Sequence, residues 1–297
     1  MKLKYGVCLS NYGKEVNLET LKATAIEAEK LGYDSIWLTD HILMPENSGT
    51  VYGTILETMT TLGYLAAVTS KVKLGISSLV MALRNPVVVA KQLATIDYLS
   101  GGRVTLATGA GWNEDEYSIL GSNFHNRGKR LDESIRLIKS LWRGDKNFES
   151  KVIRQHFDSP SFEPRPVQKE LFIWIGGNSK AAMRRARTLG DGWHADGSPP
   201  ALFRKLVSEF RAIDGPSKAI STRLAFNSRA KDTIYKGAKG DDQLMLSSNF
   251  EEDRSILEEF EKLGVSLATI EIDYNGATSR EAQIENLRTF ASKFIAN

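Results

Sequence analysis

Short apolar segments alternate with longer amphipathic segments along this chain, and this alternation restricts its fold more than any other feature. Each of eight apolar runs has the character of a buried strand and precedes a segment with helical spacing of its apolar residues. The expected strands are residues 5–9, 35–39, 72–80, 103–108, 171–175, 193–195, 222–227 and 267–272. The expected helices are residues 18–31, 56–69, 86–100, 127–142, 179–189, 201–213, 252–263 and 281–294. Eight strand–helix pairs in series favour an α/β fold, a closed parallel (β/α)8 TIM barrel, over an open sheet.

The length of 297 residues fits one such barrel with insertions, since ~250 residues is typical. We therefore expect a single domain over residues 1–297. Long loops at residues 40–54, 109–126 and 228–249 follow strands, so they belong to the C-terminal face, where barrel enzymes keep their active sites. A further insertion, residues 144–170, follows a helix, and its three prolines are typical of an extended connection.

Composition excludes several classes of protein. The net charge of +3, from 39 basic and 36 acidic residues, leaves no electrostatic signature for nucleic-acid binding. No segment approaches ~18 uninterrupted apolar residues, so no membrane span is expected. The single cysteine, Cys8, cannot form an intramolecular disulfide, and together with the absence of a signal-peptide pattern this favours a cytoplasmic protein. The histidines lack metal-ligand spacing, so no metal site is expected.

Asp40 and His41 directly follow the second expected strand. An imidazole at this position points into the barrel mouth, and an adjacent carboxylate could fix its tautomer. This arrangement suits hydrogen bonding or proton transfer beside a redox ring. A structural Asp-His pair that caps the loop is the alternative.

Two glycine-containing segments also end strands. Gly176, Gly177, Asn178 and Ser179 join the fifth strand to a helix, where paired glycines admit a ligand close to the backbone and free amides can hold a phosphate. The alternative is a tight turn with Asn178 or Ser179 as an ordinary helix cap. The small-residue segment at 107–112 could likewise admit a flat ring, or could only pack inside the barrel.

Taken together, these segments resemble the luciferase-like monooxygenase superfamily, in particular its deazaflavin-dependent oxidoreductase branch. The ordered motifs cover about residues 1–215, and the rest of the chain resembles the family only in its strand and helix pattern. The motifs are DSIWLTDH at 34–41, LRNP at 83–86, AKQLATID at 90–97, LSGGR at 99–103, GAGWNE at 109–114, RGKRLDE at 127–133, PRPVQ at 164–168, IWIGGNS at 173–179 and GDGWH at 190–194.

The resemblance implies roles for particular residues. It places Asp40 and His41 at the edge of a deazaflavin ring and the backbone of Ala110 and Gly111 near that ring. It implies a cis bond between Ser77 and Ser78, without proline, that forms a bulge behind the ring. The loop of Gly176, Gly177, Asn178 and Ser179 would hold the cofactor phosphate.

We therefore expect hydride transfer between coenzyme F420, a deazaflavin, and a small organic substrate, with the chemistry supplied by the cofactor. His41 would move a proton on the substrate and Asp40 would orient His41. The segments around residues 44–45 and at Trp112 differ from members that oxidise sugar phosphates, which disfavours that activity. An FMN-dependent monooxygenase with a flavin reductase partner, and a catalytically silent flavin-binding protein, are the alternatives. The resemblance also implies a homodimer.

Overall fold

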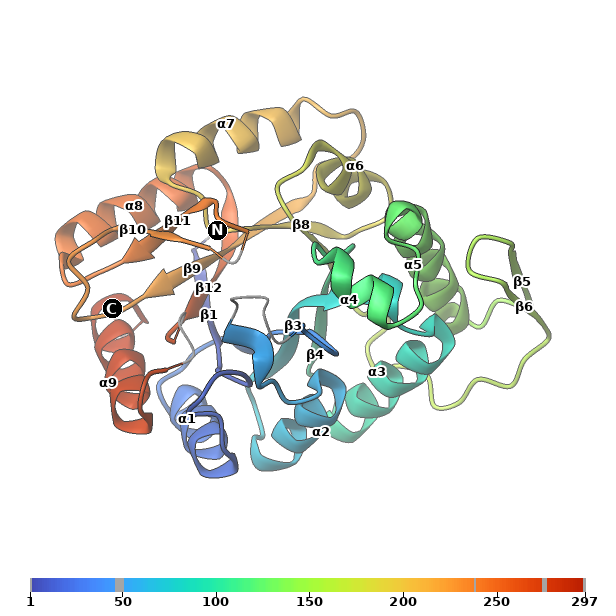
Figure 1. Ribbon diagram of the computed structural model, residues 1–297, viewed down its shortest axis with the longest axis horizontal. Coiled ribbons are helices and arrows are strands. Elements are labelled where there is room, and N and C mark those ends of the chain that lie inside the picture. Colours follow the sequence, from blue (N-terminus) through green and yellow to red (C-terminus); the bar gives the residue numbers. More distant parts are fainter. Residues whose placement is uncertain (1, 46–50, 238, 274–276, 296–297) are drawn as a thin grey trace.

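Eight parallel strands form a closed barrel in the computed structural model, which describes residues 2–45, 51–237, 239–273 and 277–295 (Figure 1). Neighbouring strands pair in chain order, and the pairing of β12 with β1 closes the ring. The predicted TIM barrel is therefore confirmed. The barrel strands are β1 (Lys4–Cys8), β2 (Ser35–Leu38), β3 (Lys73–Val80), β4 (Val104–Gly109), β7 (Ile173–Gly176), β8 (Gly192–Ala195), β9 (Ala219–Phe226) and β12 (Val265–Glu271).

The helices surround the strands as an outer ring (Figure 1). Their ends follow local signals: the side chains of Asn17 and Asn85 cap α1 and α3, and Gly101 ends α3 in a left-handed conformation. The ring consists of α1 (Leu18–Lys30), α2 (Thr58–Val68), α3 (Pro86–Ser100), α5 (Arg127–Arg143), α6 (Lys180–Thr188), α7 (Pro200–Arg211), α8 (Phe250–Lys262) and α9 (Arg280–Phe290), which continues into a π-helical turn, η4 (Ala291–Ile295).

The insertions contain more regular structure than the sequence predicts. The expected loop at 228–249 holds β10 (Ile234–Lys236) and β11 (Asp242–Leu246), and β11 extends the sheet by pairing in parallel with the end of β9. The expected extended connection at 144–170 contains a hairpin of β5 (Asn147–Ser150) and β6 (Gln155–Asp158), which projects beyond α5 (Figure 1). Residues 46–50 and 238 of the expected long loops lie outside the described residues.

Shorter elements lie in the remaining loops. They are η1 (Val51–Gly53), η2 (Met81–Leu83), α4 (Glu114–Ile119) and η3 (Phe124–Asn126). All four follow barrel strands and therefore lie on the C-terminal face: η1 follows β2, η2 follows β3, and α4 and η3 follow β4. Among the described residues, no helix is both long and apolar enough to cross a membrane.

Two tryptophans fill the interior of the barrel against glycines on neighbouring strands. Trp37 is fully buried, and a Cβ added at Gly6 or Gly75 would overlap its indole. Trp174 meets Gly192 in the same way. The missing side chains make room for the indoles, so large and small residues alternate inside the barrel and fill it without a central channel.

This packing predicts that Gly75→Ala destabilises the protein. The added methyl group would overlap Trp37, and overpacking of a core typically costs ~1–3 kcal/mol. Gly63→Ala in α2 is the matched control, because a Cβ there meets nothing within 4 Å and alanine stabilises a helix by ~0.5–1 kcal/mol. Urea unfolding of the two variants should therefore give changes of opposite sign. Equal changes would contradict the packing described for Trp37.

Candidate active site

A cavity of about 710 Å³ opens at the C-terminal ends of the barrel strands. Each residue that the sequence singles out for a site lies in its lining, although the residues come from four different strand ends. These residues are Asp40, His41, Ser77, Ser78, Ala110, Gly111, Gly176, Gly177, Asn178 and Ser179. The fold therefore brings the predicted residues together, and their individual roles stay predictions.

A bulge in β3 forms one side of the cavity. The Ser77–Ser78 peptide bond is cis, as the resemblance implies, and the register of β3 with β4 shifts between Ile76 and Leu79. Gly176 lies against this bulge, since a Cβ there would overlap the Ser78 hydroxyl. Bulges of this kind are common next to active sites because they redirect side chains.

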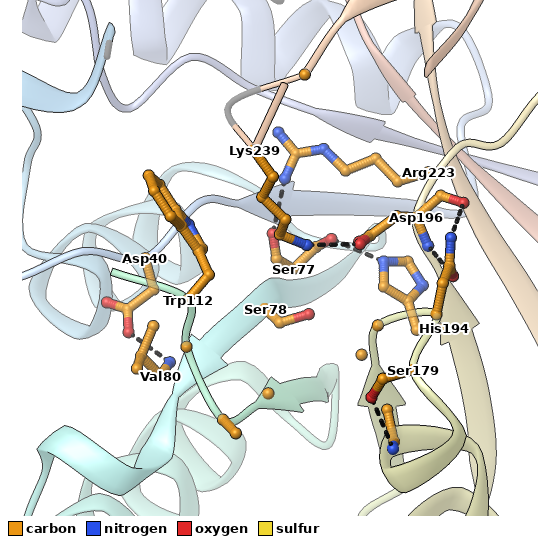
Figure 2. Close-up of a pocket in the computed structure, with 18 of the residues that line it drawn as sticks. Asp40, Ser77, Ser78, Val80, Trp112, Ser179, His194, Asp196, Arg223 and Lys239 are labelled. Atoms are coloured by element: carbon orange, nitrogen blue, oxygen red, sulfur yellow. Dashed lines mark hydrogen bonds and ion pairs between the residues drawn. The ribbon is translucent and has the colours of Figure 1, made fainter. Parts of the chain in front are cut away.

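Two buried groups from other strands hold Ser77 in place (Figure 2). Nε2 of His194 lies 2.7 Å from the Ser77 hydroxyl, and its Nδ1 lies 2.7 Å from the hydroxyl of Ser221. Nη1 of Arg223 donates to the Ser77 carbonyl at 2.8 Å. Burial lowers the pKa of His194 to about 4, so the imidazole is neutral at physiological pH.

His41 is oriented by Glu116, not by Asp40 as the sequence suggested. Its Nδ1 lies 2.8 Å from Oε2 of Glu116, which is the third residue of α4. Oε1 of Glu116 accepts from the backbone amide of Ile42 at 2.7 Å. Burial opposes the charge of Glu116, but the hydrogen bonds from His41 and the backbone keep the pKa of Glu116 below its ordinary value. The anionic partner binds Nδ1, so Nε2 is the ring nitrogen available to a ligand.

Asp40 has a different role, since its carboxylate is already bound by other groups. It accepts from Nη2 of Arg84 at 2.6 Å and from the backbone amide of Val80 at 2.8 Å. Arg84 also donates to Glu57 at 3.0 Å. Asp40 therefore connects the end of β2 to the end of β3. The prediction that Asp40 orients His41 was wrong because the side chains of successive residues point in different directions.

The glycine loop after β7 leads into the N-terminus of α6. Ser179 caps the helix by accepting from the amide of Ala182, so it acts as an ordinary helix cap, the alternative named for this residue above. The Asn178 side chain binds the backbone of Asp196, so it fixes the loop against the end of β8. The first amides of a helix have no intrahelical acceptor, and those of α6 border the cavity. Arg127 and Arg185 line the same end. Although Arg185 is paired with Asp132 outside the lining, the helix N-terminus together with two basic residues makes this end suited to an anion.

The opposite end of the cavity contains a buried ion pair that the sequence analysis missed. Arg223 on β9 binds Glu271 on β12, and its Nη2 also donates to the hydroxyl of Thr39 at 3.1 Å. The Tyr12 hydroxyl donates to Glu271 as well. One signal was present: a charged residue inside an otherwise uncharged strand must be paired when it is buried.

The insertion after β9 forms a wall over this end of the cavity. Tyr235, Lys239 and Gln243 of this insertion line the cavity, and Nζ of Lys239 lies 2.7 Å from Oδ2 of Asp196.

On the β2 side, Tyr52 and Trp112 pack on His41, with ring centroids 4.9 Å and 5.9 Å from the imidazole. Within the described ranges, no group of three or more His, Cys, Asp or Glu side chains is placed to hold a metal ion.

Comparison with known proteins gives a family match over most of the chain. The family described as luciferase-like monooxygenase matches residues 4–230. An uncharacterized protein of Mycobacterium tuberculosis is 35% identical over 63% of this chain and 68% of its own length. An F420-dependent glucose-6-phosphate dehydrogenase of Amycolatopsis mediterranei is 29% identical over 82% of this chain and 75% of its own length. The structure of the monooxygenase RslO1 from Streptomyces bottropensis superposes with a TM-score of 0.80 at 18% identity, covering 99% of each chain.

The position of Glu116 predicts a pH-dependent loss of stability in Glu116→Gln. Glutamine keeps an oxygen for the Ile42 amide but loses the charge-assisted bond to His41, which is worth ~1.5–3 kcal/mol, so the free energy of unfolding at pH 7 should fall by about 2 kcal/mol. Because folding lowers the pKa of Glu116, its contribution is present above the unfolded pKa of ~4.3 and is lost as the pH falls through the folded value. Urea unfolding at pH 7 and at pH 3 measures the difference.

Glu114→Gln is the control for this experiment, because it makes the same change on the same helix at a carboxylate that is 61% exposed. It should alter stability little at either pH. If the two variants behave alike, Glu116 does not hold the His41 segment.

Proposed function

This chain belongs to the luciferase-like monooxygenase family and is a luciferase-like oxidoreductase, and on that premise we propose that it transfers a hydride between coenzyme F420 and a small organic substrate. The observation that carries the proposal is the order of groups along one cavity: an anion-binding end at α6, a bulged platform at Ser77 and Ser78, and the pair of His41 and Glu116. This order fits a flat ring that carries a phosphate on its side chain.

The platform fits a planar ring because its neighbours have little or no side chain. Gly109, Gly111 and Gly176 line the cavity next to the bulge. The Cβ positions of Gly111 and Gly176 are filled by Val80 and Ser78, whereas a Cβ at Gly109 would meet nothing nearer than 3.8 Å. Glycine at an open position such as Gly109 permits close approach of a ligand to the backbone.

The end at α6 fits the phosphate. The amides of the first turn carry the positive end of the helix dipole, and Arg127 and Arg185 add formal charge beside them. Arg127 packs over the ring of Phe124, with its guanidinium carbon 3.5 Å from the centroid, which fixes the direction of its charge.

When bound, the deazaflavin would supply the hydride chemistry of the reaction. The protein itself would contribute proton transfer at Nε2 of His41. Glu116 accepts from Nδ1, so a neutral His41 presents a bare Nε2 that can take a proton from a substrate hydroxyl, and the resulting imidazolium is stabilised by the carboxylate. Tyr52 and Trp112 pack on the imidazole and exclude water from it.

Deazaflavin is favoured over FMN by the F420-dependent relative, whose similarity extends over most of this chain. Its sugar-phosphate substrate is not carried over, because the segments at 44–45 and at Trp112 differ. An FMN-dependent monooxygenase is the second candidate, and the family name supports it.

The first prediction of this proposal is that the protein binds F420 more tightly than FMN. Each cofactor should be titrated into the purified protein, with the quenching of cofactor fluorescence as the signal and the absorption spectrum as a check. Tighter binding of FMN would replace the proposed hydride transfer by the monooxygenase. If neither cofactor binds, the protein is a member of the family that lacks the redox activity proposed here.

The second prediction concerns the phosphate loop. Gly177 has φ of +109°, so a side chain there strains the loop even though a Cβ meets only Ala182 at 3.6 Å. Gly177→Ala should weaken cofactor binding ~10-fold, since a displaced loop costs ~1.4 kcal/mol or more of phosphate binding. Gly121→Ala is the control, because Gly121 also has positive φ but lies away from the cavity. Equal affinities in the two variants would place the phosphate elsewhere.

The third prediction separates catalysis by His41 from simple packing. His41→Ala should lower turnover ~10²–10⁴-fold at saturating cofactor, the usual contribution of an acid–base group, with a much smaller change in cofactor affinity. His125→Ala, at a side chain that is 83% exposed, should change neither quantity. A loss of turnover that only follows cofactor occupancy would remove His41 from the proton transfer.

A further inference from the structure

The two ends of the cavity differ in charge. Arg127 and Arg185 line the α6 end, and Arg185 is paired with Asp132, which lies outside the lining. At the other end, two cations, Arg223 and Lys239, face the three carboxylates of Asp196, Asp241 and Glu271 among the described residues. Figure 2 shows Ser77 and Ser78 between the two ends, with Ser179 on one side and Arg223 and Lys239 on the other. If the α6 end takes the cofactor phosphate, the end at Arg223 and Lys239 is left for the substrate.

The charge of Arg223 is already paired inside the protein. Its guanidinium binds Glu271, the Ser77 carbonyl and the Thr39 hydroxyl, which uses three of its five N–H groups. The neighbouring Glu271 raises the pKa of Arg223 well above its ordinary value despite burial, so the guanidinium remains charged and paired. A substrate carboxylate or phosphate at the other N–H groups would lie beside the carboxylate of Glu271, and contact between like charges is unfavourable.

Lys239 is also paired, although its side chain is 45% exposed. Its ammonium group lies 2.7 Å from the carboxylate of Asp196, and Asp241 lies nearby in the lining. The two carboxylates raise the pKa of Lys239 above its ordinary value despite partial burial, so the pair is ionic at neutral pH. A substrate anion at this position would meet Asp196 and Asp241 as well as the ammonium group.

The remaining lining of this end is aromatic or uncharged. Tyr52, Tyr235 and Gln243 line it, and Trp112 lies beyond His41. Aromatic side chains provide apolar faces for a carbon skeleton, and Gln243 adds a neutral hydrogen-bonding group. This part of the lining therefore offers apolar faces and a neutral hydrogen-bonding group, and both of its cations are paired with carboxylates.

We propose that the substrate end of this cavity selects uncharged alcohols or carbonyl compounds with an apolar body, and rejects carboxylates and phosphate esters. This inference rests on the proposed function, because it assumes that the cofactor takes the α6 end. Rejection follows from the carboxylates of Asp196 and Glu271, which already occupy the two cations. Asp196 is thereby a specificity-determining residue that does not need to contact the reacting atoms.

Ligand binding to the F420-saturated protein tests the proposal without turnover. Benzamide and benzoate are suitable probes, because they share a shape and differ in charge, and isothermal titration calorimetry gives both affinities. Wild type should bind benzamide at least ~10-fold more tightly than benzoate, as like-charge contacts disfavour the anion. In Asp196→Asn, an isosteric change that releases Lys239, benzoate should gain ~10-fold while benzamide changes little.

Asp242→Asn is the matched control, since Asp242 pairs with Lys236 on the same insertion but lies outside the lining. It should leave the ratio of the two affinities unchanged. The proposal is overturned if wild type prefers benzoate, if neither probe binds, or if folded Asp196→Asn keeps the wild-type ratio. Cofactor binding is measured first in the same samples. Its failure contradicts the proposed function, whereas normal cofactor binding with a preference for benzoate contradicts the substrate inference alone.

Discussion

The buried ion pair of Arg223 and Glu271 is the interaction on which the geometry of the barrel mouth depends. It joins β9 to β12, and the same guanidinium reaches the Ser77 carbonyl on β3 and the Thr39 hydroxyl at the end of β2. Glu271 in turn binds Tyr12, which follows β1. Removing one partner of such a pair typically costs ~3–5 kcal/mol, because the other charge is left buried. The pair therefore fixes the relative positions of five strand ends, and with them the bulge at Ser77.

Two further hydrogen-bonded pairs complete the site around this centre. His194, neutral because it is buried, binds the Ser77 hydroxyl and so secures the bulge from β8. Glu116 holds His41, a lining residue of the cavity, through Nδ1, so Nε2 is the ring nitrogen left for a ligand. Most of the charged side chains at the barrel mouth are thus paired with one another. The α6 end, with a helix N-terminus and two guanidinium groups, is where an anionic group of a ligand fits best.

The barrel could be predicted from the sequence because its signals are local. Apolar runs and the helical spacing of apolar residues depend on neighbours in the chain, and the structure confirms the strands and helices that they predict. The short strands β10 and β11 were missed because three to five residues in a polar loop carry little pattern, and β11 becomes a strand only by pairing with the end of β9. The positions of the candidate residues could also be predicted, since parallel strands end on one face.

Side-chain partners could not be predicted in the same way. Asp40 is next to His41 in sequence, yet His41 binds Glu116, 75 residues further along, and Asp40 binds Arg84. Such pairings are decided by tertiary packing, and the sequence offers only indirect signals, such as Arg223 and Glu271 within otherwise uncharged strands.

The crystal structure of the protein with bound F420 tests the account most directly. We expect the ring against the bulge of Ser77 and Ser78, the phosphate at Gly177 and the first turn of α6, and Nε2 of His41 facing the ring. A ring bound away from the bulge, or a phosphate held at Arg223 and Lys239, would contradict the arrangement on which the proposed function rests.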